Sequence, residues 1–143
     1  MNIKWSYKNA GHVFDTKDST GVPYLSFKAL DDTGLAVNGF STRMGGASRG
    51  KFSTMNFSYS RGDAAEDVLE NFTRMAAALG VERDRMVVSH QTHTVNLRRV
   101  TLEDAGKGVV RERDYRDIDG LITDVPGLTL VTFYADCVPL YLL

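Results

Sequence analysis

Apolar positions recur at helical spacing between residues 64 and 79, and this is the clearest pattern in the chain. The positions that share one face are Val68, Leu69, Phe72, Met75, Ala76 and Leu79. Asp63 is the expected N-cap, because Glu66 follows it three residues later as in a capping box. Gly80 suits the left-handed residue that ends a helix. We expect this helix to be scaffold and assign it no chemistry.

Short β-like stretches separated by turn residues make up most of the remaining chain. The first surrounds Trp5, Tyr7, Val13 and Phe14, and further strands are expected at residues 24–27, 35–42, 86–89, 95–100, 118–123 and 128–134. Turns are expected at residues 18–21, 31–34 and 124–127. Residues 104–117 are polar and mixed in charge, which indicates a solvated loop. No repeat or linker divides the chain, so we expect one domain over residues 1–143.

The last six residues, from Val138 to Leu143, have the pattern of a buried strand that runs to the end of the chain. Domains seldom stop inside a core strand, because the neighbouring strands would lose a partner. We therefore expect this chain to be the N-terminal part of a longer protein, incomplete after Leu143. A short C-terminal edge strand is the alternative.

Composition narrows the class of protein without naming a function. The chain has 17 Lys and Arg against 18 Asp and Glu, a net charge of −1, which offers no argument for a nucleic-acid or membrane partner. No apolar stretch approaches the roughly 18 residues of a membrane span, and the first residues lack a long apolar h-region, so we expect no secretory signal. The one cysteine excludes an internal disulfide and fits a reducing, cytoplasmic setting. The sequence does not indicate an oligomeric state.

A glycine-rich segment follows the strand expected at residues 35–42. Gly45, Gly46 and Ser48 lie just after Arg43, and an arginine beside a glycine nest is a reasonable anion site. The segment is neither a Walker phosphate loop nor a dinucleotide fingerprint, because the required following residues are missing. A plain turn is the competing interpretation.

Two other positions carry donor atoms for chemistry. His90 and His93 lie three apart, so on a strand or loop they should point to different sides and not share one metal. Cys137 follows a strand and could bind a metal such as zinc, or act as a nucleophile beside a histidine base. A buried cysteine without a role is the alternative. Two ligands are too few for a zinc site, so the residues alone do not decide between these functions.

Ordered sequence blocks over residues 35–143 resemble the YfiH/YlmD family, also called the laccase-domain or polyphenol-oxidase family. The matching blocks are residues 40–48, 52–56, 62–63, 68, 70–71, 91–93, 119–124 and 135–139. They include Gln91-Thr92-His93, which is similar to a Gln-x-His motif, and Ala135-Asp136-Cys137. The resemblance implies an α+β fold, a layered sandwich of mixed β-sheets with flanking helices.

The resemblance also implies a site and an activity. Family members hold a metal, usually zinc, with the histidine of Gln-x-His, the cysteine of Ala-Asp-Cys and a second histidine further downstream. The first two correspond to His93 and Cys137, which we expect to be the catalytic and metal-binding residues. The third has no counterpart before Leu143, so we expect an incomplete metal site. Zinc is the expected cofactor, with copper as the alternative.

The implied activity is purine nucleoside phosphorolysis, with methylthioadenosine phosphorolysis and adenosine deamination also found in the family. The partners would then be a purine nucleoside and phosphate. Arg43, Gly45, Gly46 and Ser48 are expected to bind phosphate. The amides Asn56 and Gln91 suit hydrogen bonds to sugar or base, and Asp136 is expected to orient a metal ligand.

Three other interpretations compete with a purine nucleoside phosphorylase. A copper polyphenol oxidase would need several copper sites, which one cysteine and three histidines cannot build. A cysteine hydrolase would use Cys137 as nucleophile and His93 as base. An inactive fragment would keep the inherited but incomplete site.

Overall fold

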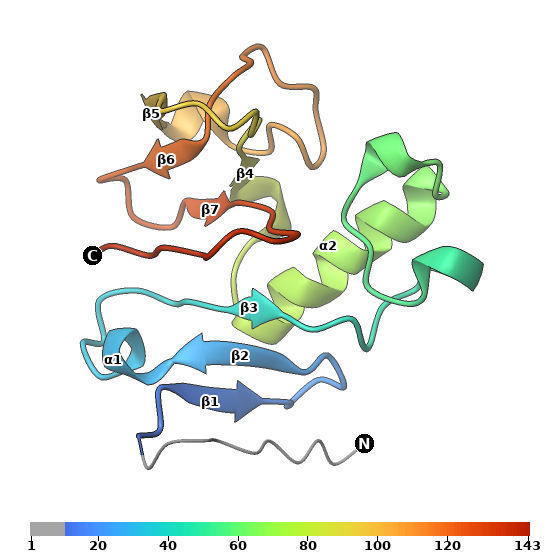
Figure 1. Cartoon of the computed structure of the whole chain (residues 1–143), viewed down its shortest axis with the longest axis horizontal. Coiled ribbons are helices and arrows are strands. Elements are labelled where there is room, and N and C mark those ends of the chain that lie inside the picture. Colours follow the sequence, from blue (N-terminus) through green and yellow to red (C-terminus); the bar gives the residue numbers. More distant parts are fainter. Residues whose placement is uncertain (1–10) are drawn as a thin grey trace. The chain divides into compact units, whose positions relative to one another are not determined.

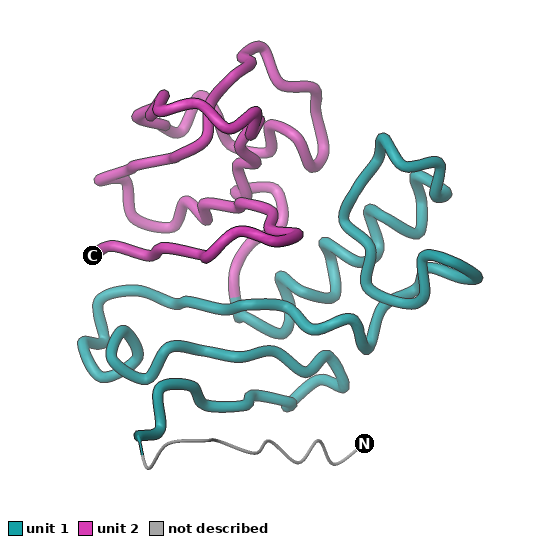
Figure 2. Tube along the Cα trace, viewed as in Figure 1, with its two compact units in different colours: residues 1–80, 143 teal, residues 81–142 magenta. Residues whose placement is uncertain are grey.

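The computed structural model describes residues 11–143, drawn in Figure 1. The chain forms two compact units, one up to Gly80 and one from Val81 to Leu142, with Leu143 grouped with the first (Figure 2). The β-like stretch expected around Trp5 and Tyr7 lies outside the described residues. No helix among the described residues is long and apolar enough to cross a membrane.

The first unit contains an antiparallel sheet in the order β1-β2-β3, which comprise Phe14–Lys17, Tyr24–Phe27 and Phe40–Ser41. The strand expected at residues 24–27 is confirmed in full, whereas only the last part of the one expected at 35–42 forms. Asn38 explains the shortening, because its side-chain oxygen accepts a hydrogen bond from the backbone N–H of Phe27 at 2.7 Å. At Phe27, the last residue of β2, this side-chain bond takes the place of a backbone hydrogen bond to β3. A short helix, α1 (Lys28–Asp31), precedes this stretch.

The expected long helix is α2, which spans Ala65–Leu79 and ends at Gly80 with a left-handed φ of 70°. The expected N-cap is wrong, because Ala64 occupies that position and no side chain caps the helix. The Asp63 carboxylate instead accepts hydrogen bonds from the Ala64 N–H and from Asn56. The apolar face packs as expected: Met75 and Ala78 join a core with Val22, Tyr24 and Met55. Two short 3-10 turns, Gly50–Phe52 and Tyr59–Arg61, precede α2.

The second unit contains two parallel strand pairs. β4 (Met86–Val88) pairs with β7 (Thr129–Val131), and β5 (Leu97–Arg99) pairs with β6 (Gly120–Ile122). All four expected strands are therefore present, each shorter than predicted. One 3-10 turn, Arg83–Arg85, directly precedes β4, and another, Leu102–Asp104, lies between β5 and β6 in the chain. The core of the unit consists of Val87, Val100 and Tyr115.

Two expectations about burial in this unit are wrong. Residues 138–143 form no strand, and Val138 and Leu142 are 88% and 86% exposed. β7 was expected to be buried, yet it pairs with β4 alone among the described strands, and Leu130 and the following Phe133 are exposed. The faces of a strand are buried only where other elements pack against them, and pairing with a single strand does not supply that cover.

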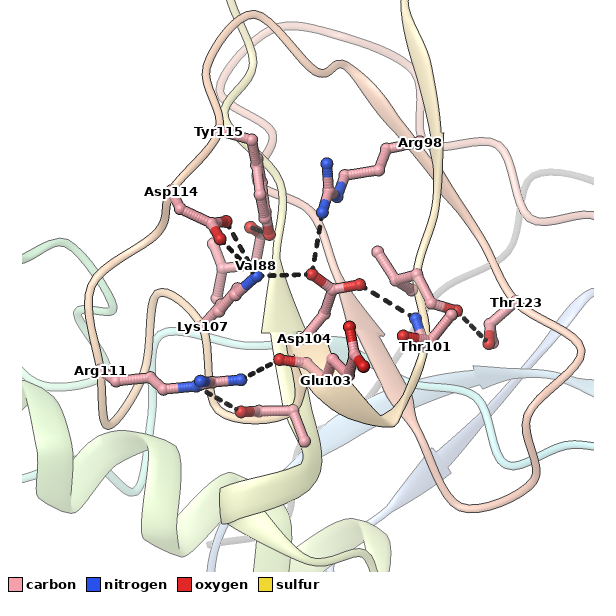
Figure 3. A network of polar contacts seen from close by, with 12 residues as sticks. Val88, Arg98, Thr101, Glu103, Asp104, Lys107, Arg111, Asp114, Tyr115 and Thr123 are labelled. Carbon is pink, nitrogen blue, oxygen red and sulfur yellow. Dashed lines mark hydrogen bonds and ion pairs between the residues drawn. The ribbon is translucent and has the colours of Figure 1, made fainter.

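The polar segment at residues 104–117 is anchored, although the sequence indicated a solvated loop. Asp104 and Lys107 are buried, and Lys107 Nζ contacts Asp104 at 2.7 Å and Asp114 at 2.8 Å (Figure 3). The Tyr115 hydroxyl donates to the carbonyl of Val88 in β4 at 2.6 Å. Opposite charges three residues apart thus pair inside the unit, which charge composition alone cannot distinguish from a solvated surface. The structure is a mixed α+β fold with several small sheets and few helices, as expected from the resemblance.

Candidate functional site

The two predicted metal ligands follow the two strands of one parallel pair. His93 lies five residues after Val88, the end of β4, and Cys137 lies six residues after Val131, the end of β7. Val88 and Val131 are register partners. Because the carboxyl ends of parallel strands meet at the same edge, the segments that carry His93 and Cys137 leave the sheet together. We refer to residues 89–94 as the His arm and residues 132–137 as the Cys arm.

Hydrogen bonds join the two arms beyond the strands. The Ser89 N–H donates to the carbonyl of Val131 at 3.0 Å. Gln91 then pairs with the backbone of Phe133 in both directions: its Nε2 donates to the carbonyl at 2.9 Å, and its Oε1 accepts from the N–H at 2.7 Å. The Ser89 hydroxyl holds the same Oε1 at 3.0 Å. Gln91, expected to contact substrate, therefore fixes the His arm against the Cys arm in this structure.

Asp119 organises the tip of the His arm. Its carboxylate accepts hydrogen bonds from the backbone N–H groups of Thr92, His93 and Thr94 at 3.1, 2.8 and 3.0 Å. The Thr94 hydroxyl adds a fourth at 2.8 Å. Desolvation alone would raise the pKa of Asp119, but these four donors outweigh it and lower the pKa to about 2. The carboxylate is thus ionised at neutral pH.

His93 has a left-handed backbone, with a φ of 63° that few residues other than glycine adopt. Its imidazole is exposed, whereas its N–H is held by Asp119. The neighbouring His90 has a different environment, because its Nδ1 accepts a hydrogen bond from the N–H of Asp117 at 3.1 Å. The His90 imidazole therefore has a hydrogen-bond partner within the unit, whereas the His93 imidazole is exposed.

Cys137 and Asp136 lie at the end of the Cys arm, and both are exposed. Cys137 is therefore not the buried, inert cysteine that the sequence left open. Zinc prefers sulfur and nitrogen ligands, so Cys137 and His93 are residues of a kind that can bind this ion. They do not complete a site: among residues 11–143, no three or more His, Cys, Asp or Glu side chains gather where they could hold a metal.

The glycine-rich segment belongs to the first unit. A side chain at Gly46 would overlap the carbonyl of Thr54, so the close approach of the two backbones requires glycine there. The N–H of Gly46 donates to the Thr54 hydroxyl at 3.1 Å, and the N–H of Ser48 donates to the Thr54 carbonyl at 3.0 Å. These two N–H groups, expected to bind phosphate, are paired within the unit. Gly45 beside them has a φ of 81°, which also favours glycine.

Two of the other residues expected to bind substrate have internal partners. Ser48 is only 2% exposed, and its hydroxyl accepts a hydrogen bond from Asn71 at 2.8 Å. The Asn56 amide donates to Asp63 at 2.8 Å and thereby lowers the pKa of that carboxyl. Arg43 differs: its guanidinium is anchored by one bond to the carbonyl of Lys51 at 3.0 Å and is otherwise exposed. Among the residues expected to bind phosphate, Arg43 alone presents an exposed side chain.

Asn71 is a key residue of this loop to which the sequence assigned no role. It is fully buried on α2, accepts a hydrogen bond from the N–H of Ala47 at 2.6 Å, and donates to Ser48 and to the carbonyl of Asn56. It thereby joins the glycine-rich segment to the segment around Asn56. The sequence does contain one indication of this role. Asn71 lies three residues after Val68 and four before Met75, so helical spacing places its polar side chain on the apolar face of the helix.

A family model described as "Multi-copper polyphenol oxidoreductase laccase" matches residues 37–143, which include the glycine-rich segment and both arms. The chain is 37% identical over 110 residues to "Purine nucleoside phosphorylase YlmD" of Geobacillus stearothermophilus, an alignment that covers 74% of this chain and 39% of that protein. It is 32% identical over 127 residues to a purine nucleoside phosphorylase of Bacteroides thetaiotaomicron, covering 87% of this chain and 45% of that one.

Two solved structures have the same fold over most of the chain. The crystal structure of YlmD from Geobacillus stearothermophilus superposes with a TM-score of 0.73 at 33% identity, covering 87% of this chain and 45% of that one. The Bacillus licheniformis hypothetical protein YfiH gives a TM-score of 0.75 at 28% identity, covering 85% and 45%. This chain thus spans less than half the length of these relatives. It belongs to the multi-copper polyphenol oxidoreductase laccase family, together with the YlmD and YfiH proteins.

Proposed function

We propose that this chain carries part of the active site of a purine nucleoside phosphorylase. The observation that carries the proposal is the pairing of β4 with β7, which sends the His arm and the Cys arm from one sheet edge. The chain also shares 37% identity with a relative named as such an enzyme. A reactive group at the carboxyl edge of a parallel sheet is a common arrangement in enzymes.

The reaction transfers a ribosyl group from a purine to phosphate. A phosphate oxygen bonds to C1′ of the sugar, the C1′–N9 bond breaks, and its electron pair leaves with the purine, which is then protonated. Positive charge develops on the sugar, and the phosphate anion stabilises that charge when it is held close to C1′. The products are a free base and ribose 1-phosphate.

Arg43 is the residue we assign to phosphate. Its guanidinium offers several donors in a planar fork that matches phosphate geometry. The segment with Gly45, Gly46 and Ser48 then acts as its support, because hydrogen bonds to Thr54 and Asn71 fix the shape of that loop.

His93 and Cys137 would hold a zinc ion, and Asp136 beside Cys137 would help to orient the Cys arm. When bound, zinc supplies a Lewis acid that polarises substrate, or for adenosine deamination a site for activating water. Further coordination positions would be filled by water or other groups. A reducing compartment such as the cytoplasm would keep the Cys137 thiol available.

The test is an assay of the protein that contains this chain, with adenosine, inosine or methylthioadenosine as substrate, with and without inorganic phosphate. We expect phosphate-dependent release of the free base together with ribose 1-phosphate, or with methylthioribose 1-phosphate when methylthioadenosine is the substrate. His93→Ala and Cys137→Ala should each remove most of that activity, whereas His12→Ala, which changes an exposed histidine outside both arms, should leave it unchanged. Arg43→Ala should raise the KM for phosphate more than the KM for nucleoside.

Two results would contradict the proposal. Base release that does not depend on phosphate would indicate hydrolysis. Wild-type turnover in both His93→Ala and Cys137→Ala would show that the two arms do not form the reactive centre. Inosine formed from adenosine in the same assay would add deamination as a second activity.

The family description favours a second candidate, a copper-dependent phenol oxidase. Such enzymes use several copper ions, and the three histidines and one cysteine of this chain are too few to bind them. Oxidation of a phenol by the copper-loaded chain, with oxygen consumed, would favour this function over phosphorolysis.

A further inference from the structure

We propose that Asp119 is the positioning residue for His93 and sets the direction in which its imidazole leaves the His arm. This inference rests on the proposed function, because it takes His93 to be a metal ligand. Asp119 itself touches neither substrate nor metal in this proposal and acts only through the backbone of the His arm.

The carboxylate binds three consecutive N–H groups, those of Thr92, His93 and Thr94, and the Thr94 hydroxyl. Three successive N–H groups can converge on one anion only when the backbone curls around it. The left-handed φ of His93, 63°, is the bend that produces this curl. Since the same bend fixes the Cα–Cβ direction of His93, the carboxylate and the imidazole orientation are linked.

Asp119 is itself held on a rigid element. It directly precedes β6, its N–H donates to the carbonyl of Asn96 at 3.1 Å, and its neighbour Ile118 forms a bridge with His90. The His arm is therefore attached to the β5–β6 pair through Asp119 and to the Cys arm through Gln91. The hydrogen bonds of Gln91 to the Cys arm and those of Asp119 to the tip of the His arm together restrict the backbone of His93.

The fold of the unit does not depend on this carboxylate. Thr92, His93 and Thr94 are exposed, so water could satisfy their N–H groups if Asp119 were replaced. The core of the unit, formed by Val87, Val100 and Tyr115, makes no use of Asp119. Replacement should therefore disturb the His arm locally and leave global stability almost unchanged.

The experiment titrates the metal-free chain with Co²⁺, which reports a thiolate ligand by a charge-transfer band and imidazole by its visible spectrum. Asp119→Asn keeps the size of the side chain but replaces one acceptor oxygen by an amide. We expect it to weaken Co²⁺ binding roughly 10–100-fold and to change the visible spectrum. Asp124→Asn is the matched control, an exposed aspartate paired with Arg99 at 2.9 Å, and should bind Co²⁺ as the wild type does.

Thermal unfolding and amide hydrogen exchange separate positioning from a structural role. Asp119→Asn should unfold at the same temperature as Asp124→Asn, with faster exchange confined to Thr92, His93 and Thr94. If Asp119→Asn lowers the unfolding temperature, Co²⁺ binding by a second variant, Thr94→Val, tests the inference. This variant removes one hydrogen-bond donor to the carboxylate and keeps Asp119 itself. Weaker Co²⁺ binding in Thr94→Val supports the inference, and unchanged binding overturns it.

The same titration separates failure of this inference from failure of the proposed site. Loss of Co²⁺ binding in His93→Ala and Cys137→Ala, with wild-type binding in Asp119→Asn, would overturn the role of Asp119 and leave the site standing. Wild-type Co²⁺ binding in His93→Ala and Cys137→Ala would overturn the site, and the positioning role with it.

Discussion

Glycine at position 46 illustrates how a single residue shapes the first unit. The backbone of Gly46 lies so close to Thr54 that any side chain would overlap the Thr54 carbonyl. The segment therefore depends on glycine for close packing, whereas at Gly45 a left-handed φ of 81° adds a conformational requirement. From the sequence, both glycines suggested only a flexible anion-binding turn.

Gly46→Ala should destabilise the chain by about 1–3 kcal/mol, the usual cost of adding a methyl group to a tightly packed position. Chemical denaturation followed by circular dichroism measures the change in the free energy of unfolding. Gly11→Ala is the control, since a side chain there meets open space, and its effect should stay within about 0.5 kcal/mol. Equal effects of the two substitutions would refute the packing argument.

At the scale of elements, α2 both fills a core and supports a loop. Its apolar residues pack inward as their spacing predicts, while Asn71 on the same face makes three hydrogen bonds to the segments around Ala47 and Asn56. A buried amide with partners on two loops fixes their relative position. The helix α2, predicted to be scaffold only, therefore also fixes the conformation of the glycine-rich segment that follows Arg43.

Asn71→Ala should destabilise the chain by about 2–4 kcal/mol, because it leaves the half-buried N–H of Ala47 and the half-buried carbonyl of Asn56 without this partner and opens a small cavity. The unfolding midpoint in urea gives the measurement. Thr73→Ala on the same helix is a suitable control and should change stability by less than about 0.5 kcal/mol. A mild effect of Asn71→Ala, equal to that of Thr73→Ala, would show that the loop does not depend on the helix.

The elements that the sequence predicts well are those set by local pattern. The periodicity of α2 and the apolar content of β2 and β4 place these elements within one or two residues. The failures come from specific side-chain contacts that the pattern of apolar and polar residues does not show: Asn38 shortens β3 by bonding to Phe27, and Lys107 is buried by pairing with Asp104. In the candidate site, His93 and Cys137 follow from a resemblance, but the roles of Gln91, Asp119 and Asn71 depend on residues 15 to 42 positions away in the chain.

At the scale of the whole molecule, one buried carboxylate connects stability to pH. Burial opposes the ionised form of Asp104, but hydrogen bonds from Lys107, the Thr101 N–H and Arg98 outweigh it and lower its pKa from 3.8 to about 2. The ionised carboxylate stabilises the folded state, so its contribution is present above its unfolded pKa and is lost as the pH falls through about 2.

The free energy of unfolding should therefore fall as the pH is lowered from about 5 to about 2, measured by urea denaturation at each pH. Asp104→Asn should be less stable than the wild type at neutral pH, because Lys107 loses its ionised partner, but its stability should depend less on pH in this range. A wild-type stability that stays constant down to pH 2, or a variant with the same pH dependence as the wild type, would show that the ionisation of Asp104 is not coupled to folding.

The central claim is that the His arm and the Cys arm converge at one sheet edge, so that His93 and Cys137 can share an ion. Because Cys137 is the only cysteine, His93→Cys creates a single thiol pair whose proximity can be measured directly. A short bis-thiol cross-linker applied to dilute protein, followed by mass spectrometry, should join Cys137 to the new thiol within one chain in most molecules. The wild-type protein is the control, because with Cys137 as its one thiol it can form no cross-link within one chain. Cross-links only between separate molecules, or none, in the His93→Cys protein would show that the two arms do not converge.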